Sequence, residues 1–263
     1  MQNGYILDLD GTVYLEDNAI DGAAETIRVL RERGDKVVFL TNKSIETIES
    51  YVQKLNSLGI EADNEDVINS NLLVAKYLNG KLNCNEKVMI IGEEPLVNQV
   101  TSFNIKISDN PNEVKYVVLG WDRKFTYDKL NLVFQAWKKG ACIIATNPDR
   151  TCPMKYGQVP DCGAIIGAVE GATGEKVEIV LGKPSLLAAQ FIVDDILMIP
   201  PERCFMVGDR IETDIKMGID FGLNSILVLT GITDVSMLKK SPYKPNFTLN
   251  SIKDILNLKV EIP

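Results

Sequence analysis

Two carboxylates at alternate positions close the first apolar segment of the chain. Residues 5–9 are apolar except for Asp8, and Asp10 follows directly, with Gly11 and Thr12 after it. At the end of a strand the backbone turns, so both acids can converge on one site. One free carboxylate can attack an electrophilic phosphorus, and a second can transfer protons. An Asp-Gly pair between apolar segments is also typical of a hairpin turn, and this segment alone leaves both interpretations open.

Three further apolar segments also end on polar or ionisable residues. Thr41 and Asn42 follow one segment, Lys183 follows another, and Asp209 follows a third, with Asp214 in the next expected helix. Each residue alone has an ordinary interpretation: Thr41 as a helix cap, Lys183 as a solvated charge and Asp209 as a turn residue. The carboxyl ends of parallel strands lie at one edge of a sheet, where α/β proteins bind ligands. The combination therefore favours one shared site.

The residue types in this set indicate a site for a phosphate and a hard cation. Asp8 and Asp209 could bind Mg²⁺, which takes carboxylate, phosphate and water oxygens. Lys183 could neutralise phosphate charge. Thr41 and the backbone N–H groups at the start of a helix near Ser44 could hold the phosphate oxygens.

Composition narrows the chemistry and the class of partner. The chain has 263 residues, 45% hydrophobic and 24% charged, and a net charge of −8, which argues against nucleic acid or an anionic membrane as the main partner. It contains no histidine, which excludes Ser-His-Asp and Cys-His catalysis and histidine metal ligands. Five scattered cysteines, no leader pattern and no apolar run of about 20 residues predict a cytoplasmic protein with reduced thiols.

Alternating strands and helices predict an α/β fold with a doubly wound parallel sheet. Strands are expected at residues 5–9, 37–40, 67–68, 87–91, 116–119, 142–145, 179–181, 204–207 and 225–229. Helices are expected from about Asp21 and at residues 44–58, 72–78, 96–103, 127–139, 163–172, 186–193 and 211–221. The end of the chain after Thr230 has a less regular pattern. A polar stretch at 79–83 predicts a boundary between a core (1–79 and 179–263) and an inserted α/β domain (80–178).

The four motifs resemble those of the haloacid dehalogenase-like (HAD) superfamily of aspartate-nucleophile phosphatases. The matching residues are Asp8–Val13, Thr41, Lys183 and Gly208–Asp214. The insert resembles the α/β cap of the NagD-like, 4-nitrophenyl-phosphatase branch (subclass IIA). Local phrases similar to that branch are residues 8–14, 41–44, 145–149, 180–184 and 228–231.

The resemblance implies a Rossmann-like core with an inserted cap, and it implies roles for the acids. Asp8 would be the nucleophile and a metal ligand. Asp10 would be the general acid and base, and its backbone carbonyl would bind the metal. Asp209 would be the other protein ligand of the metal. Asp214 would contact these ligands without binding the metal itself. Lys183 would be catalytic and would also contact the phosphate.

The resemblance also implies which residues contact the phosphate-bearing substrate, namely Thr41, Asn42, Lys43 and Lys183. Many relatives carry Asn or Arg where Lys43 stands, so a backbone contact transfers more safely than a side-chain contact. In the cap loop at 146–160, Asn147 and Asp149 are candidates for choosing the substrate. They are at least as well explained as turn residues around Pro148.

We therefore expect a Mg²⁺-dependent phosphatase that hydrolyses small phosphomonoesters, such as sugar phosphates, through an aspartyl-phosphate. Its partner would be a small phosphorylated metabolite, and caps of this type offer a surface for a homodimer. Alternatives are a phosphotransferase or mutase that uses the same intermediate, and a phosphate-ligand binding protein without turnover. Asp10 argues against a dehalogenase, because the dehalogenases of the superfamily lack an acid there. A binding protein would need neither Asp8 as nucleophile nor Asp10 as acid.

Overall fold

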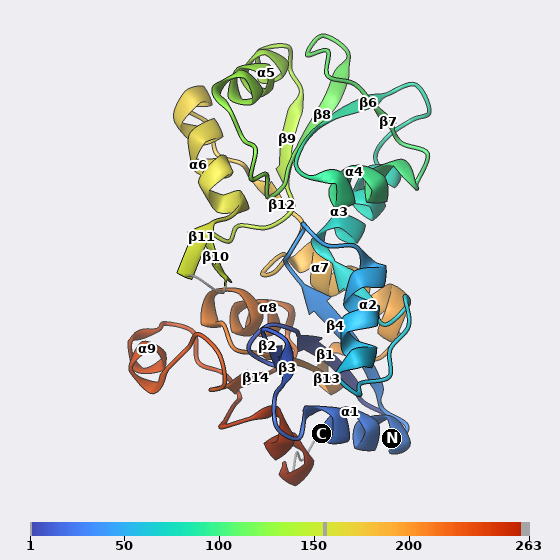
Figure 1. The fold of residues 1–263 in the computed structure, drawn as a ribbon, viewed down its shortest axis with the longest axis vertical. Coiled ribbons are helices and arrows are strands. Elements are labelled where there is room, and N and C mark those ends of the chain that lie inside the picture. Colours follow the sequence, from blue (N-terminus) through green and yellow to red (C-terminus); the bar gives the residue numbers. More distant parts are fainter. Residues whose placement is uncertain (1, 155–156, 259–263) are drawn as a thin grey trace. The chain divides into compact units, whose positions relative to one another are not determined.

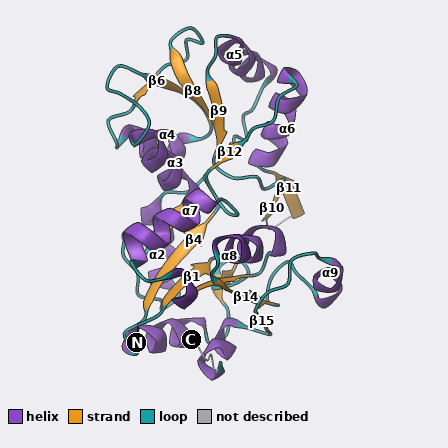
Figure 2. Ribbon diagram, turned by 180° about the vertical axis from the view of Figure 1, so that it is seen from behind, coloured by secondary structure: helices purple, strands orange, loops and turns teal. Residues whose placement is uncertain are grey.

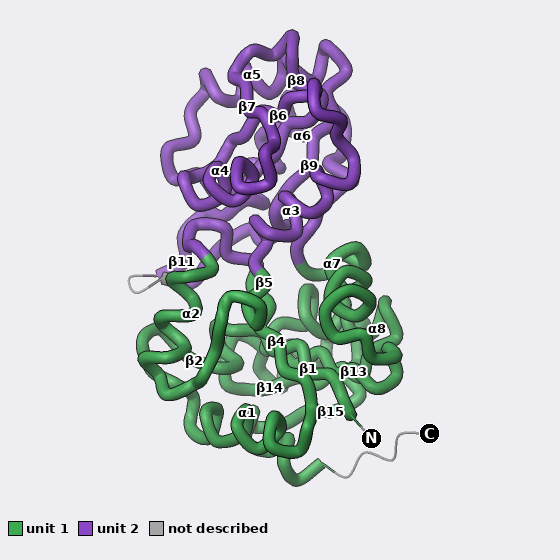
Figure 3. The backbone as a smooth tube through the Cα atoms, turned by 90° about the vertical axis from the view of Figure 1, so that its right-hand side faces the viewer, with its two compact units in different colours: residues 1–41, 48–68, 183–263 green, residues 42–47, 69–182 purple. Residues whose placement is uncertain are grey.

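The computed structural model of the chain describes residues 2–154 and 157–258 and divides into two compact units (Figure 1). Unit 1 comprises residues 1–41, 48–68 and 183–263, and unit 2 comprises residues 42–47 and 69–182 (Figure 3). The chain therefore passes between the units after Thr41, Thr47, Ile68 and Gly182. From the sequence we expect a catalytic core at residues 1–79 and 179–263 and an inserted cap at residues 80–178. The assignment of these two roles stays a prediction.

Unit 1 is built on a six-stranded sheet in the order β15-β14-β13-β1-β4-β5. Its strands are β1 (Gly4–Asp8), β4 (Lys36–Thr41), β5 (Val67–Asn69), β13 (Cys204–Gly208), β14 (Asn224–Val228) and β15 (Phe247–Leu249). β1 is parallel to both β4 and β13, β13 is parallel to β14, and β14 is parallel to β15. Every residue of β1 and β13 is buried, as expected for parallel strands whose two faces are covered by helices. The predicted α/β fold is confirmed.

Helices accompany these strands along the chain (Figure 2). The helical segments of unit 1 are α1 (Ala23–Glu32), α2 (Ile48–Ser57), α7 (Leu186–Gln190), π-helix η1 (Phe191–Leu197), 3₁₀-helix η2 (Pro201–Arg203), π-helix η3 (Ile211–Ile215), α8 (Lys216–Phe221), α9 (Val235–Lys240) and 3₁₀-helix η4 (Ile252–Asn257). In α1 the apolar residues recur every three or four positions, so Ala23, Ile27 and Leu30 are buried. A hairpin, β2 (Tyr14–Leu15) and β3 (Asn18–Ala19), follows β1.

Two expectations from the sequence are wrong in detail. The helix expected at 44–58 begins only at Ile48, because residues 42–47 belong to unit 2 and their carbonyl groups accept hydrogen bonds from side chains of that unit. The N–H groups near Ser44 are therefore not the start of a helix. The end of the chain after Thr230 is also more regular than expected, since α9, β15 and η4 lie there.

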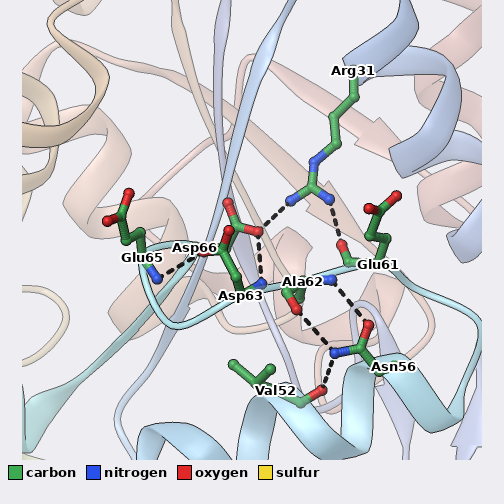
Figure 4. A network of polar contacts seen from close by, with 8 residues as sticks. All are labelled: Arg31, Val52, Asn56, Glu61, Ala62, Asp63, Glu65 and Asp66. Carbon is green, nitrogen blue, oxygen red and sulfur yellow. Dashed lines mark hydrogen bonds and ion pairs between the residues drawn. The ribbon is translucent and has the colours of Figure 1, made fainter.

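A polar network holds the loop between α2 and β5 against α1 (Figure 4). Arg31 donates a hydrogen bond to Oδ2 of Asp66 at 2.9 Å, and the Asn56 side chain bonds to both the N–H and the carbonyl of Ala62. The carbonyl of Asp66 then accepts from the N–H of Phe39 in β4 at 2.8 Å. The network therefore fixes the loop next to β4, the strand that ends at Thr41.

Unit 2 contains a second parallel sheet, in the order β12-β9-β8-β6-β7. Its strands are β6 (Lys87–Ile91), β7 (Lys106–Ile107), β8 (Val114–Leu119), β9 (Cys142–Ala145) and β12 (Ile179–Val180). Its helices are α3 (Ser70–Asn79), α4 (Glu94–Thr101), α5 (Tyr127–Lys138) and α6 (Cys162–Thr173). Val117, Val133 and Ile165 share one core cluster, which joins β8 to α5 and α6. An antiparallel hairpin of β10 (Thr151–Met154) and β11 (Gly157–Pro160) follows β9.

Two expectations for the whole chain can be compared with the structure. All five cysteines are free thiols, and burial raises the pKa of Cys162 to about 12 and that of Cys204 to about 11. Among the described residues, no helix has both the length and the apolar character needed to cross a membrane. The cytoplasmic location stays a prediction.

Candidate active site

Asp8 is buried at the carboxyl end of β1, the strand between β4 and β13. Its Oδ1 forms an ion pair with the ammonium of Lys183, and the hydroxyl of Thr12 donates to its Oδ2 at 3.4 Å. In the parallel register of β1 and β13, Leu7 lies opposite Val207. Asp8 and Asp209 therefore leave neighbouring strands at the same edge of the sheet, as the sequence predicted.

Asp8, Asp209 and Asp214 form one carboxylate cluster, in which one oxygen of each residue lies within 4.8 Å of the others. The turn from β13 into η3 places Asp214 there, since the N–H of Arg210 donates to Asp214 Oδ2 at 3.0 Å. Lys183 forms an ion pair with Asp214 at 2.7 Å and donates to the carbonyl of Leu40 at 3.2 Å. Because Lys183 is only 3% exposed, its charge acts inside this cluster rather than in solvent.

Three glycines make room for these acids. A Cβ atom at Gly11, where φ is +87°, would lie 2.7 Å from Oδ2 of Asp209, and one at Gly231 would lie 2.0 Å from the same oxygen. A Cβ atom at Gly208 would lie 2.2 Å from Oδ2 of Asp214. Real Cβ atoms do not approach so closely, so the carboxylates occupy space that only glycine leaves.

The turn at residues 230–233 is a part of the site that sequence reasoning did not assign. The N–H of Ile232 donates to Asp209 Oδ2 at 2.6 Å, and the hydroxyl of Thr230 donates to the carbonyl of Gly11 at 2.6 Å. The available signal was a Thr-Gly pair directly after a buried strand. Its backbone donor orients the carboxylate of Asp209.

Comparisons with known proteins agree with this arrangement. Residues 5–106 match the family described as haloacid dehalogenase-like hydrolase, and residues 180–255 match a second family described as HAD-hydrolase-like. Sugar-phosphatase AraL of Bacillus subtilis (strain 168) is 38% identical over 258 residues, which are 98% of this chain and 93% of that protein. The chain belongs to the haloacid dehalogenase-like superfamily. The acid sugar phosphatase of Staphylococcus haemolyticus (strain JCSC1435) is 36% identical over 96% of this HAD chain and 93% of its own length.

Solved structures place this HAD protein in the NagD-like branch. The 4-nitrophenylphosphatase of Thermotoga maritima superposes with a TM-score of 0.92 at 34% identity, covering 97% of each chain. NagD of E. coli superposes with a TM-score of 0.87 at 25% identity over 100% of each chain. The predicted membership in subclass IIA and the Rossmann-like core are confirmed. The protein is an enzyme of the phosphoric monoester hydrolase class.

Charge is unbalanced in the acid cluster of this HAD phosphatase, because the cluster holds three carboxylates and Lys183 forms ion pairs with two of them, Asp8 and Asp214. Burial raises the pKa of Asp8 well above its ordinary value, and Asp214 and Asp209 add to the rise against the attraction of Lys183. Burial and the charge of Asp214 raise the pKa of Asp209 to about 6. Burial works against the charge of Lys183, but Asp214 and Asp8 outweigh it and raise its pKa. With every group charged, the cluster carries a net charge of −2.

Three features of the cluster suit a divalent cation: the type of its ligand atoms, its net charge, and one carboxylate oxygen that accepts no hydrogen bond from the described residues. Its ligand atoms are carboxylate oxygens, which Mg²⁺ prefers, and a charge of +2 would balance the net −2. Asp209 Oδ1 is buried and has no hydrogen-bond partner among the described residues. Asp8, Asp209 and Asp214 could therefore hold a metal ion. The contribution of the Asp10 carbonyl to this site stays a prediction.

The other site residues predicted from the sequence are distributed over both units. Asp10 is half-buried and forms a backbone bridge with Tyr14. Thr41 is the last residue of β4 and is buried in unit 1, whereas Asn42 and Lys43 belong to unit 2. Their contacts with a substrate, like the catalytic roles of Asp10 and Lys183, stay predictions.

Proposed function

We propose that this phosphatase hydrolyses small phosphomonoesters, sugar phosphates among them, with Mg²⁺ and through an aspartyl-phosphate on Asp8. The observation that carries the proposal is the buried carboxylate of Asp8 at a strand end, paired with Lys183 and clustered with Asp209 and Asp214. Two relatives that match nearly the whole chain are named as sugar phosphatases, which supports the substrate class.

In the first half-reaction an oxygen of Asp8 attacks phosphorus, and the bond between phosphorus and the ester oxygen breaks. Asp10 gives a proton to the leaving oxygen, so the alcohol departs neutral. Lys183 balances the charge of Asp8 and of the transferred phosphoryl group. Bound at the carboxylate cluster, Mg²⁺ would supply positive charge to the phosphoryl oxygens.

In the second half-reaction water attacks the phosphorus of the aspartyl-phosphate, and Asp10 takes the proton that the water loses. The bond between phosphorus and Asp8 breaks, which releases inorganic phosphate and restores the free carboxylate. Lys183 neither gives nor takes a proton in either half-reaction, and its ion pairs with Asp8 and Asp214 favour its charged form. Asp10 thus returns to its starting protonation state after each turnover.

We further propose that the two units have different roles in catalysis and in substrate selection. Unit 1 is the catalytic core and the insert at 80–178 is the cap that selects the substrate. Thr41, Asn42, Lys43 and Lys183 contact the phosphate. The partner is a small phosphorylated metabolite rather than nucleic acid or a membrane, the enzyme works in the cytoplasm, and the cap is the surface available for a homodimer.

The test is phosphate release from 4-nitrophenyl phosphate and a panel of sugar phosphates, with Mg²⁺ and with EDTA. We expect release that depends on the metal and that Asp8→Asn abolishes. Acid quenching during turnover, followed by mass spectrometry of the peptides, should find phosphate on Asp8. Release that survives in Asp8→Asn would contradict the proposal. Transfer to an added alcohol in preference to water would favour the phosphotransferase alternative.

A further inference from the structure

The segment that follows Thr41 is held by side chains of unit 2. The carbonyl of Asn42 accepts a hydrogen bond from the hydroxyl of Ser70 at 2.8 Å and another from the amide Nδ2 of Asn147 at 3.0 Å. Both donors are fully buried, on α3 and in the loop after β9. Two donors on one carbonyl fill its two lone pairs and leave the peptide group a single orientation.

This orientation extends to the next amide, because the peptide group is planar and trans. The N–H of Lys43 points opposite to the carbonyl of Asn42, and so away from the two buried donors. Two residues later the same support recurs, since Asn71 donates to the carbonyl of Ser44 at 2.9 Å. Side chains of unit 2 thus set the backbone direction of the whole 42–44 segment.

Gly182, the last residue of unit 2 before Lys183, lies against Asn42, the first residue of unit 2 after Thr41. The N–H of Gly182 donates to the carbonyl of Thr146 at 2.7 Å. A Cβ atom at Gly182 would lie 2.5 Å from Oδ1 of Asn42 and 2.6 Å from the carbonyl oxygen of Thr146. Asn42 also donates from Nδ2 to Asp149 at 2.9 Å. Gly182 directly precedes Lys183, so the residues next to Thr41 and Lys183 touch each other inside unit 2.

We propose that Asn147 and Ser70 are positioning residues of this phosphatase. Through the carbonyl of Asn42 they set the direction of the N–H of Lys43, and through Asn42 they fix Gly182, the residue before Lys183. The inference rests on the proposed function, in which this segment contacts the phosphate. It also gives Asn147 a role other than direct choice of substrate.

The test compares three variants that disturb the support at different atoms. Asn147→Asp keeps the shape but replaces the donor by an oxygen, Ser70→Ala removes the other donor, and Gly182→Ala pushes against Asn42. We expect kcat/KM for 4-nitrophenyl phosphate to fall about 10- to 100-fold, the effect of a misplaced contact group. The inhibition constant of inorganic phosphate should rise with it. Asn147→Asp combined with Ser70→Ala should lose less than the product of the single losses, because both act on one carbonyl.

Gly92→Ala is the matched control, because a Cβ atom there would lie 2.7 Å from the side chain of Leu96 in the apolar part of the same unit. It should lower the melting temperature as much as the test variants while leaving phosphate inhibition unchanged. If Asn147→Asp does not fold, Ser70→Ala and Gly182→Ala decide. Test variants that bind phosphate as tightly as Gly92→Ala would overturn the inference.

Thr41→Val separates this inference from the proposed function. If Thr41→Val raises the inhibition constant of phosphate and Asn147→Asp does not, the positioning role alone is wrong. If wild-type enzyme releases no phosphate, or Thr41→Val leaves inhibition unchanged, the proposed phosphate contacts are wrong as well. A rise in both variants supports the two together.

Discussion

The two parallel sheets carry acids at their carboxyl ends in opposite ways. In unit 2, Glu93 follows β6 and accepts two hydrogen bonds from the guanidinium of Arg123, at 2.6 and 2.7 Å, which lower the pKa of Glu93. In unit 1, Asp8 and Asp214 both form ion pairs with Lys183, Asp209 lies in the same cluster, and burial raises the pKa of Asp8 and of Asp209. Both sheets are parallel, while the charge balance of the acids at their carboxyl ends differs.

The difference teaches where to look for chemistry in an α/β chain. A carboxylate whose charge and hydrogen bonds are matched by its own cation, as in Glu93, gains little from binding a further cation. We therefore expect it to stabilise its loop and not to bind a ligand. Acids that outnumber their cations in a buried cluster raise the free energy of the metal-free protein, and a bound cation would lower it. The following predictions test that contrast between Asp8 and Asp209 on one side and Glu93 on the other.

Removal of the proposed nucleophile should have the largest effect. Asp8→Asn keeps the shape of the side chain but cannot form the aspartyl-phosphate, and we expect kcat to fall on the order of 10⁴-fold or more. The measurement is steady-state release of phosphate under saturating substrate and Mg²⁺. Glu93→Gln is the control, and it should leave kcat within about twofold of wild type, since surface pairs contribute little.

Removal of a ligand should next abolish the response to metal. Asp209→Asn takes one negative charge out of the cluster, so the metal-free variant should melt at a higher temperature than metal-free wild type. Its affinity for Mg²⁺ should fall by about 100-fold or more. Thermal unfolding with and without Mg²⁺ measures both effects. A wild-type melting temperature that does not rise with Mg²⁺ would contradict the metal site.

The two regions should respond to pH with opposite sign. Native Asp209 has its pKa raised from 3.8 to about 6, so it stabilises the metal-free fold below about pH 4 and loses that contribution as pH rises through about 6. The expected loss between pH 4 and 6 is about 2 kcal/mol. Glu93 has a lowered pKa, so its contribution is present above its ordinary value of 4.5 and is lost on acidification.

Denaturant unfolding in EDTA at several pH values measures this contrast. Asp209→Asn should reduce the decline between pH 4 and 6 that wild type shows, since Asp8 then remains as the acid with a raised pKa, while Glu93→Gln should retain the full decline. Equal pH dependence in wild type and Asp209→Asn would show that the raised pKa of Asp209 does not control stability.

Disruption of the satisfied pair should have the smallest effect. Arg123 is 57% exposed at its side chain, and Arg123→Ala should lower the free energy of unfolding by about 1 kcal/mol or less. It should leave kcat unchanged, and high salt should reduce its effect on stability. If Arg123→Ala lost as much activity as Asp209→Asn, the contrast between the acids of the two sheets would be wrong.

Part of the site could be predicted from the sequence because Asp8 ends one buried strand and Asp209 directly follows another. In a parallel sheet such ends meet, and Asp8 and Asp209 do so. The strand before Lys183, β12, instead belongs to the sheet of unit 2, so the rule of strand ends does not account for the ion pair between Lys183 and Asp8. Long periodic segments such as α1 and α5 were also predictable, since an apolar stripe determines which face is buried.

The features that the sequence did not predict depend mostly on contacts between residues that are distant in the sequence. The turn that supports Asp209 was not assigned, because the hydrogen bond from Ile232 follows from tertiary structure. The start of α2 was placed too early because side chains such as Ser70 and Asn71 capture the carbonyl groups of 42–44. Short hairpins, such as β2 with β3, contain too few residues to show a period.

The pairing of β1 with β13 has a consequence for synthesis on the ribosome. Gly4 pairs with Cys204, so the strand that carries Asp8 waits for about 200 further residues before that neighbour exists. At ordinary translation rates this interval lasts roughly 10 to 40 s. All strands of the unit 2 sheet emerge within it, from Lys87 to Val180. The nascent chain can therefore complete its inserted sheet while Asp8 still lacks the strand that brings Asp209.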